Sequence, residues 1–302
     1  MAISVANAPC SYGAFEFTVG IDPNVPDGVA LLNQVSTAGY AGIDLGPVGY
    51  LGTGRALHDR LAARGLVLAG GYVPLPFPDP AAFADEIGYL DALLDIFDAA
   101  PDGPPPRPTL ADSGSPARRA APGGGGHDPS LSLDAAGWRN FADSVARAAE
   151  RCRKRGYEPA FHHHTGTYIE GVAEIEQLLE LTDVNLCLDT GHLLVGGGEP
   201  AKGLRDWAER INHVHLKDAR RDIVAGIVAD AAPLEEIWRR RAFCALGQGD
   251  VGMEDVLSAI TDIGYSGWLI VEQDIFPDPT EPPGRAAADQ AANREWLRAR
   301  GI

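Results

Sequence analysis

Four segments of the chain end in side chains that can bind a metal ion or transfer a proton. They read F-H-H-H-T-G at 161–166, N-L-C-L-D-T-G-H at 185–192, I-N-H-V-H-L-K-D at 211–218 and W-L-I-V-E-Q-D at 268–274. In each segment an apolar or alternating run typical of a β-strand comes first, and polar residues follow where the run ends. We therefore expect the four strand ends to converge on one divalent metal ion.

The predicted metal ligands are two carboxylates and two imidazoles. Asp189 and Glu272 each follow an apolar run, where burial of a carboxylate is costly unless a cation or hydrogen-bond donors lie beside it. His215 alternates with His213, which puts both on one face of their strand. With His162 as the first ligand, this mixed oxygen and nitrogen set suits Mn²⁺, Co²⁺, Zn²⁺ or Fe²⁺ better than Ca²⁺.

The three consecutive histidines are predicted to divide between two faces, because side chains alternate along a strand. His162 and His164 then share one face, and His163 lies on the other. His164 is expected beside the substrate, where a histidine can act as a general base near neutral pH. Two other interpretations fit the same pattern: the histidines are buried and held by hydrogen bonds, or His164 orients a metal ligand.

Three further residues are candidates for catalytic roles. His192 ends the D-T-G-H motif and is expected to reach a substrate hydroxyl, unless it only begins the following helix. Lys217 lies on the same strand face as His215 and can stabilise an oxyanion, unless it is an exposed, solvated side chain. Glu272 is a second candidate for the general base, in addition to its role as a metal ligand.

The elements that must hold these residues alternate along the whole chain. Short apolar runs are predicted as strands at 3–6, 42–45, 67–73, 109–111, 159–162, 185–188, 213–216 and 268–271. Stretches with helical spacing are predicted at 28–38, 57–62, 80–99, 132–155, 172–181, 200–210 and 253–263. We therefore expect an α/β protein with one (β/α)8 TIM-barrel domain over 1–302, in which chemistry lies at the carboxyl ends of the strands.

The stretch from 101 to 129 interrupts this alternation. It contains P-D-G-P-P-P-R-P and A-A-P-G-G-G-G-H-D-P, which cannot form a helix interior and offer little to bury. Residues 113–129 are therefore expected to form a flexible loop, either as a lid over the site or as a disordered insertion.

Composition excludes several classes of function. The chain of 302 residues has 42 acidic residues against 25 Lys and Arg, and its formal net charge of −17 would repel a phosphate backbone. No nucleic-acid partner is therefore expected. The 4 cysteines form no C-x-x-C pair, and no apolar run suggests a leader or a membrane span. These features predict reduced thiols and a cytoplasmic protein with no membrane association.

The order of four motifs resembles that of a known family. D-T-G-H, H-V-H-L-K-D, G-Q-G-D-V and the late V-E resemble the xylose isomerase-like barrels, a family of sugar phosphate isomerases and epimerases. The resemblance is closer to the inosose dehydratases, through H-H-H-T-G-T at 162–167, I-D-L-G-P-V-G-Y-L at 43–51 and L-A-G-G-Y-V-P-L at 68–75. It covers most of the chain and is weakest in the first strand and at 101–129. The wider family binds its metal through Glu, Asp, His and Glu, and His162 stands where the first Glu would be.

The resemblance implies a divalent metal cofactor, Mn²⁺ or Co²⁺ first and Zn²⁺, Fe²⁺ or Mg²⁺ next. It implies a lyase that acts on a cyclic keto-polyol such as 2-keto-myo-inositol, by α-proton removal and β-elimination through a metal-stabilised enediolate. The alternatives are a keto-sugar isomerase or epimerase, a 3-keto-glycoside eliminase and a sugar-binding barrel without catalysis. The acidic charge argues against an apurinic-site endonuclease. A small-molecule sugar or cyclitol is the expected partner, and family members often form homo-oligomers.

Overall fold

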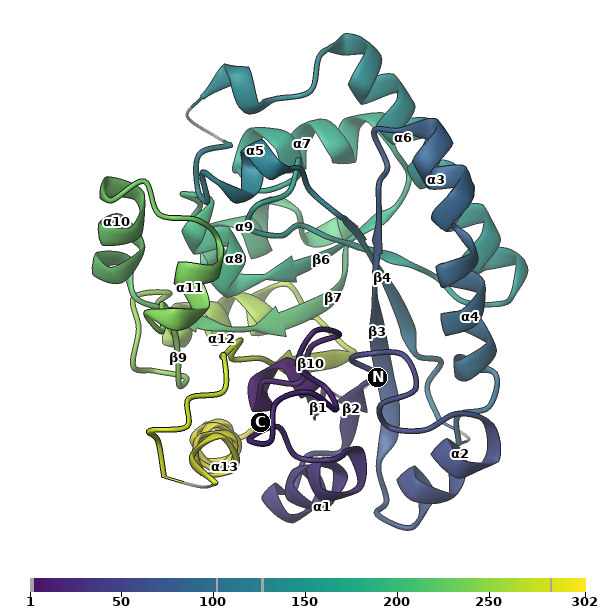
Figure 1. Cartoon of the computed structure of the whole chain (residues 1–302), viewed down its shortest axis with the longest axis vertical. Helices are drawn as coiled ribbons and strands as arrows, with labels where there is room; N and C mark the ends of the chain where they lie inside the picture. Colours follow the sequence, from purple (N-terminus) through teal and green to yellow (C-terminus); the bar gives the residue numbers. More distant parts are fainter. Residues whose placement is uncertain (1–2, 102, 126–127, 283) are drawn as a thin grey trace.

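Parallel strands close into a barrel at the centre of the molecule, with helices around it (Figure 1). The structure is a computed structural model that describes residues 3–101, 103–125, 128–282 and 284–302. The strands pair in the closed order β1-β10-β7-β6-β5-β4-β3-β2. Their bounds are β1 Ser4–Asn7, β2 Gly42–Asp44, β3 Val67–Leu75, β4 Arg107–Asp112, β5 Ala160–His162, β6 Asn185–Asp189, β7 Ile211–Leu216 and β10 Trp268–Val271. The predicted (β/α)8 barrel is confirmed, and each predicted strand is present with ends that differ by at most two residues.

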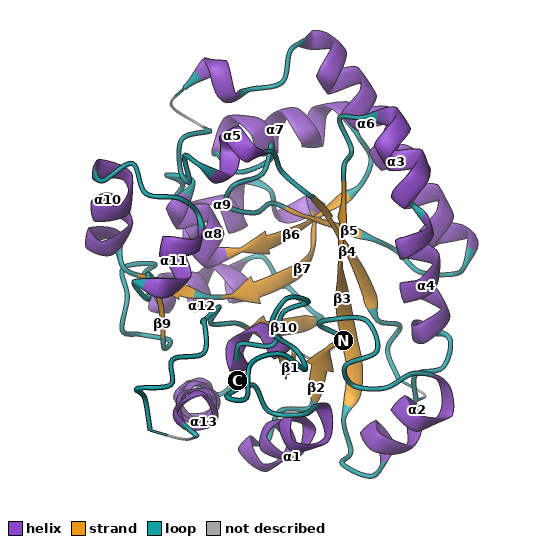
Figure 2. Cartoon of the chain, viewed as in Figure 1, coloured by secondary structure: helices purple, strands orange, loops and turns teal. Residues whose placement is uncertain are grey.

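The helices form a ring outside the strands (Figure 2). Their apolar faces pack on the barrel: in α6 (Ala135–Lys154) the buried side chains recur at helical spacing from Trp138 to Cys152. Aspartates begin several of these helices; Asp27, for example, accepts hydrogen bonds from the first N–H groups of α1. The other main helices are α1 Gly28–Ala38, α2 Gly54–Ala62, α3 Pro80–Glu86, α4 Gly88–Phe97, α7 Val172–Leu181, α9 Pro200–Asp206, α12 Met253–Asp262 and α13 Arg285–Arg298.

The structure departs from the predicted elements at several places, and the last helix, α13, was not predicted. The helix predicted at 80–99 is divided into α3 and α4, and the one predicted at 200–210 ends at Asp206 in α9 before a short 3-10 turn. The regions on either side of β7 hold elements that were not predicted. These are α8 Thr190–Val195 before β7, and β8 Asp218–Ala219, α10 Arg221–Ala229, α11 Glu235–Arg239 and β9 Phe243–Cys244 after it. Strands β8 and β9 pair in an antiparallel sheet of their own, too short for a periodic pattern to reveal.

The 113–129 segment is built into the fold more firmly than its composition suggests. It forms a short helix, α5 (Pro116–Arg119), whose first turn is capped by Ser115. Arg118, which lies between the two Pro- and Gly-rich motifs, is only 1% exposed, so this segment buries a large charged side chain that was not expected. Residues 126–127 lie outside the described residues, and movement of the loop stays a prediction. None of the described helices combines the length and hydropathy that a membrane crossing needs.

Side chains fill the inside of the barrel and leave no room for a side chain at Gly70 on β3. A Cβ atom there would lie 2.9 Å from Oδ2 of Asp44 and 3.5 Å from Nε2 of His213. His213 and His215 are both buried, with ring centres 5.3 Å apart. Their alternation on β7 therefore places both inside the barrel, with His215 nearer its carboxyl end.

The strand register brings the candidate site residues to that same end. Asp189 at the end of β6 pairs with His215 of β7. On the other side, His215 pairs with Ile270 of β10, two residues before Glu272. His162 is the last residue of β5, which pairs with β6. Neighbouring strands thus deliver the four side chains to one point.

Candidate active site

The four predicted metal ligands meet at the carboxyl end of the barrel. Nε2 of His162 lies 3.1 Å from Nδ1 of His215 and 3.7 Å from Oδ2 of Asp189. Nδ1 of His215 lies 3.7 Å from the same Asp189 oxygen and 3.2 Å from Oε2 of Glu272. One possible ligand atom from each residue lies within 4.8 Å of all the others, and all four residues are buried.

These separations fit a single divalent ion. Ligand atoms that are about 2.0–2.2 Å from a metal stand roughly 3–3.5 Å apart at tetrahedral or octahedral angles. Oδ2 of Asp189 is buried and accepts no hydrogen bond in the described part of the chain; its contacts are ion pairs. The donor atoms and their spacing therefore suit a metal ion.

The ammonium group of Lys217 lies next to the four candidate ligands. Its Nζ lies 3.0 Å from Oδ2 of Asp189 and 2.9 Å from Oε2 of Glu272. A third carboxylate, that of Asp274, lies 3.0 Å from the same nitrogen. Burial alone would lower the pKa of Lys217, but the three carboxylates outweigh it and raise the pKa well above its usual value. Lys217 is 1% exposed, which excludes the alternative of a solvated surface lysine.

The same contacts keep the carboxylates ionised. Burial alone would raise the pKa of Asp189, but the Lys217 ammonium and a neighbouring imidazole outweigh it and hold the pKa well below the usual value. Burial also opposes ionisation of Glu272, where His215 and Lys217 together lower the pKa. Burial lowers the pKa of His162 to about 4. Burial also opposes the charged form of His215, but Cys187 and Glu272 outweigh it and raise the pKa of His215 well above its usual value. An ionised carboxylate and a neutral imidazole are the forms that bind a metal ion, so binding at His215 would release a proton.

The D-T-G-H motif positions both Asp189 and Lys217. Oδ1 of Asp189 accepts a hydrogen bond from the N–H of His192 and so caps helix α8, which leaves Oδ2 for the site. Gly191 makes room for the lysine, because a Cβ atom there would lie 2.6 Å from Cγ of Lys217. A local contact therefore explains the residue type at Asp189 and at Gly191.

The three consecutive histidines divide between two faces as predicted. His163 points away from the site and accepts a hydrogen bond at Nε2 from the N–H of Asp189. His164 lies half-buried on the cavity wall. Its Nδ1–H donates to the carbonyl oxygen of Thr165 at 2.9 Å, which leaves Nε2 as a proton acceptor. Burial, helped by neighbouring imidazoles, lowers the pKa of His164 well below its usual value, so the ring is neutral as a general base must be.

A second cluster stands beside the four candidate ligands and consists of His164, His192 and Asp274. The rings of His164 and His192 are 3.8 Å apart, and Nε2 of His192 lies 3.6 Å from Oδ2 of Asp274. His192 is buried behind His164 and is not among the described residues that line the cavity. The structure therefore does not bring it to a substrate as predicted. Asp274 was missed, although the two-residue period of W-L-I-V-E-Q-D puts it on the face of Glu272.

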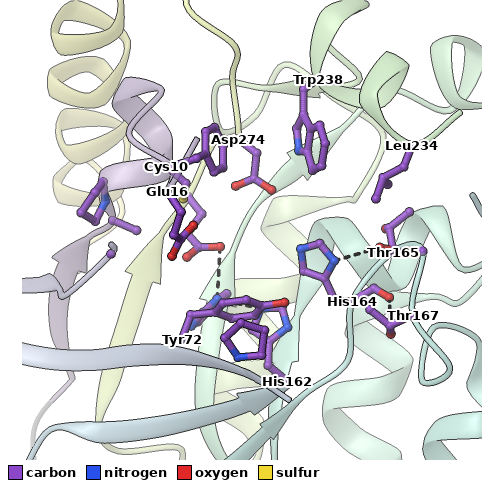
Figure 3. A pocket seen from close by; sticks show the side chains of 18 of the residues that line it. Cys10, Glu16, Tyr72, His162, His164, Thr165, Thr167, Leu234, Trp238 and Asp274 are labelled. Carbon is purple, nitrogen blue, oxygen red and sulfur yellow. Dashed lines mark hydrogen bonds and ion pairs between the residues drawn. The ribbon is translucent and has the colours of Figure 1, made fainter. Parts of the chain in front are cut away.

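A cavity of about 270 Å³ opens over these residues (Figure 3). The lining residues that sequence reasoning missed include Asp274, Cys10, Asp44 at the end of β2 and Asp112 at the end of β4. Burial raises the pKa of Asp44 and of Asp112 to about 6. Both aspartates follow strand-like runs, the same signal that identified Asp189, so the signal was present in the sequence.

A family model described as the xylose isomerase-like TIM barrel matches residues 32–300. Inosose dehydratase from Geobacillus kaustophilus is 35% identical over 148 residues, which are 48% of this chain and 48% of that relative. The chain thus spans about half the length of the curated relatives it matches.

Solved structures resemble the whole barrel. D-allulose 3-epimerase from Methylomonas sp., in complex with D-allulose, has a TM-score of 0.70 at 15% identity and covers 99% of this chain and 97% of that chain. The probable 3-DHS dehydratase involved in petrobactin synthesis from Bacillus anthracis has a TM-score of 0.66 at 13% identity, over 98% of each chain. At these identities the likeness concerns the fold.

Proposed function

The chain belongs to the xylose isomerase-like TIM barrel family, and we propose that it is a divalent-metal-dependent lyase that acts on a cyclic keto-polyol. The proposed reaction removes the proton next to the keto group and expels a hydroxyl group from the following carbon. Half of the chain is 35% identical to an inosose dehydratase, which supports this reaction and an inosose-like substrate. The ion we propose is Mn²⁺ or Co²⁺.

One observation carries the proposal: the buried Oδ2 of Asp189 accepts no hydrogen bond in the described chain, yet faces two imidazoles and an ammonium group. Here Oδ1 caps a helix and Oδ2 is turned to the site. A divalent ion held by the four candidate ligands would polarise a keto oxygen and acidify the neighbouring C–H group.

The chain's own residues supply the proton transfers. Nε2 of His164 is the free acceptor on the cavity wall and takes the α-proton. The Lys217 ammonium also lines the cavity and stabilises the negative charge that develops on the substrate oxygens. Lys217 can also donate a proton to the departing hydroxyl group, whereas His192 is buried and is not among the described residues that line the cavity.

A second candidate reaction is epimerisation of a keto-sugar. Glu272 lines the same cavity as His164 and approaches from the other side of His215, from β10 rather than β5. Return of the proton from the Glu272 side would invert the carbon that lost it, without elimination. The two reactions therefore share the first step and differ in the second, which is either loss of the hydroxyl group or return of the proton.

The test is incubation of the purified protein with scyllo-inosose in deuterated water, with Mn²⁺ or Co²⁺ restored. We expect an ultraviolet-absorbing diketone product that carries deuterium at the carbon that lost the hydroxyl group, because the enol left by the elimination takes up a solvent proton there when it becomes the diketone. Deuterium incorporation with only an epimer as product would favour the second reaction. Absence of exchange with scyllo-inosose and with a panel of keto-sugars would contradict both.

A further inference from the structure

Cys187 on β6 is a buried thiol that the proposed reaction does not use. It lies two residues before Asp189 in N-L-C-L-D, so both side chains point to the same face of the strand. Cys187 pairs with His213 on β7, and Asp189 pairs with His215. Since His213 and His215 lie inside the barrel, Cys187 lies inside it too, one layer deeper than Asp189.

The thiol of Cys187 lies close to both imidazoles of the candidate metal site. On β5 its pairing partner is His162. One possible ligand atom each from His162, Cys187 and His215 lies within 4.8 Å of the other two. We call these three residues the lower set, and we call His162, Asp189, His215 and Glu272 the upper set. The two imidazoles thus belong to both sets, with carboxylates toward the cavity and a thiol deeper in the barrel.

The two sets suit different ions. The carboxylate oxygens of the upper set suit Mn²⁺, whereas a thiolate sulfur with two imidazole nitrogens suits a softer ion such as Zn²⁺. Ligand atoms at zinc distances of about 2.0–2.3 Å stand roughly 3.5 Å apart at tetrahedral angles. The atoms of the lower set lie within 4.8 Å of one another, so small rotations of the side chains would close them on an ion.

The two sets exclude one another because they share His162 and His215. An ion held by the lower set takes both imidazoles from the upper set and leaves Asp189 and Glu272 to pair with Lys217. Two divalent ions at such close range would also repel each other strongly. Binding in the lower set therefore removes the proposed Mn²⁺ site.

A second thiol lies near the site but is less suited to hold an ion. Cys10 forms a group with Glu272 and Asp274. Both of these carboxylates already contact the ammonium group of Lys217, at 2.9 and 3.0 Å. That positive charge would repel a metal ion bound beside Cys10.

We propose that the lower set binds thiophilic divalent ions such as Zn²⁺, and that this binding inhibits the Mn²⁺-dependent reaction. The coordination step balances without an oxidant or reductant, because the sulfur–metal bond forms as the thiol proton passes to solvent. The metal position itself goes beyond the proposed function, and only the inhibition rests on it.

The test uses Cd²⁺ as the probe, because a thiolate bound to Cd²⁺ gives an ultraviolet charge-transfer band that carboxylate and imidazole ligands do not give. We expect titration of the metal-stripped wild type with Cd²⁺ to produce this band in the difference spectrum, and the ¹¹³Cd resonance to report a sulfur ligand. Both measurements need no variant. A wild type that binds Cd²⁺ without the band, or binds no Cd²⁺, would overturn the proposal.

Substitutions identify the sulfur atom. Cys187→Ser should remove the band, and Cys10→Ser should keep it. Cys152→Ser is the matched control, because Cys152 is equally buried but lies in α6, outside the strands, and it should keep the band. Loss of the band in Cys10→Ser but not in Cys187→Ser would place the ion beside Cys10 and overturn the lower set.

Mn²⁺ binding shows whether Cys187→Ser is folded. The upper set does not include Cys187, so the affinity for Mn²⁺, measured by calorimetry, should change by less than about tenfold. The affinity for Cd²⁺ should fall by about tenfold or more, because the sulfur ligand is lost. An unchanged Cd²⁺ affinity in this variant would contradict the proposal.

The Cd²⁺ band separates this proposal from the proposed function, because it requires no turnover. The band would support the lower set even if scyllo-inosose proved inert, and that inertness would remove the lyase activity alone. With an active Mn²⁺-loaded protein, Zn²⁺ should inhibit the wild type at about tenfold lower concentration than Cys187→Ser. Equal inhibition of the two proteins would overturn the inhibitory role.

Discussion

Nζ of Lys217 lies 3.0 Å from Oδ2 of Asp189, the oxygen that also faces the imidazoles of His162 and His215. An ammonium group and a divalent ion that share one carboxylate repel each other. The lysine therefore keeps the carboxylates ionised at the expense of some metal affinity. The positive charge of Lys217 also lies beside the position where a negatively charged enediolate would form, and would stabilise it.

Replacement of Lys217 by Met tests this relationship. The substitution removes the charge and keeps most of the length of the side chain. Activity is expected to fall by about 100-fold or more, because the charge on the substrate oxygen loses a partner. The affinity for Mn²⁺, measured by calorimetry, should rise by about tenfold, because the repulsion is gone. Weaker Mn²⁺ binding in the variant would contradict the assigned role.

Asp189→Asn separates folding from metal binding. Asparagine keeps an oxygen at Oδ1 to cap α8, so the melting temperature should change little. It loses the charged Oδ2, and Mn²⁺ affinity should fall by about 100-fold or more. His163→Gln is the control, because His163 points away from the site and its replacement should change the affinity by less than about tenfold. Equal losses in the two variants would contradict the ligand assignment.

Arg118 is expected to be among the most costly residues to truncate outside the site. Its Nη2 lies 2.7 Å from Oε2 of Glu174, its Nε donates to the carbonyl oxygen of Thr167, and all of these groups are buried. Arg118→Ala leaves a buried carboxylate unpaired and should lower the free energy of unfolding by about 3–5 kcal/mol. The neighbouring Arg119 pairs with Glu235 at the surface.

Arg119→Ala is the matched control for that prediction. Both partners of its ion pair are more than one-third exposed, with 47% and 38% of their side-chain surface accessible, and the loss should stay below about 1 kcal/mol. Urea unfolding of the two variants side by side measures the difference. An Arg118→Ala variant as stable as Arg119→Ala would show that the 113–129 segment contributes little to the fold.

The raised pKa of Asp112 predicts that the free energy of unfolding depends on pH. Burial raises its pKa from 3.8 to about 6, so between these values the folded protein binds more protons at this carboxyl than the unfolded chain does. Its contribution to stability is therefore fully present below pH 3.8 and is lost as the pH rises through about 6, which at neutral pH costs on the order of 2–3 kcal/mol.

Asp112→Asn should remove that contribution. Gly114 and Tyr168 both donate to Oδ2, and the asparagine oxygen can accept both bonds. The difference in unfolding free energy between variant and wild type, measured by urea titration between pH 4 and 8, should increase in favour of the variant across this range. A difference that does not change with pH would contradict the raised pKa.

The barrel could be predicted because its strands are buried on both faces and read as short apolar runs. The run W-L-I-V at 268–271 matches β10 residue for residue. Convergence of His162, Asp189, His215 and Glu272 then followed from the fold, since the carboxyl ends of parallel strands share one end of a barrel. Their roles as ligands stay predictions.

The contacts that could not be predicted from the sequence join residues that are distant along the chain. Asp274 is 57 residues from Lys217, and no local pattern shows that the lysine is buried among carboxylates. Arg118 lies in a Gly- and Pro-rich segment and is stabilised by Glu174, 56 residues later. The composition of this segment says nothing about residues elsewhere in the chain. Glu174, which pairs with Arg118, can be recognised as its partner only once the fold is known.

The most direct test is titration of the metal-stripped protein with Mn²⁺, with metal binding and the rate of solvent deuterium exchange on scyllo-inosose followed in the same samples. We predict one ion bound per chain and an exchange rate that rises along the same saturation curve. An exchange rate that stays unchanged in the presence of a chelator, or a chain that binds no Mn²⁺, would contradict metal-dependent proton removal at this site.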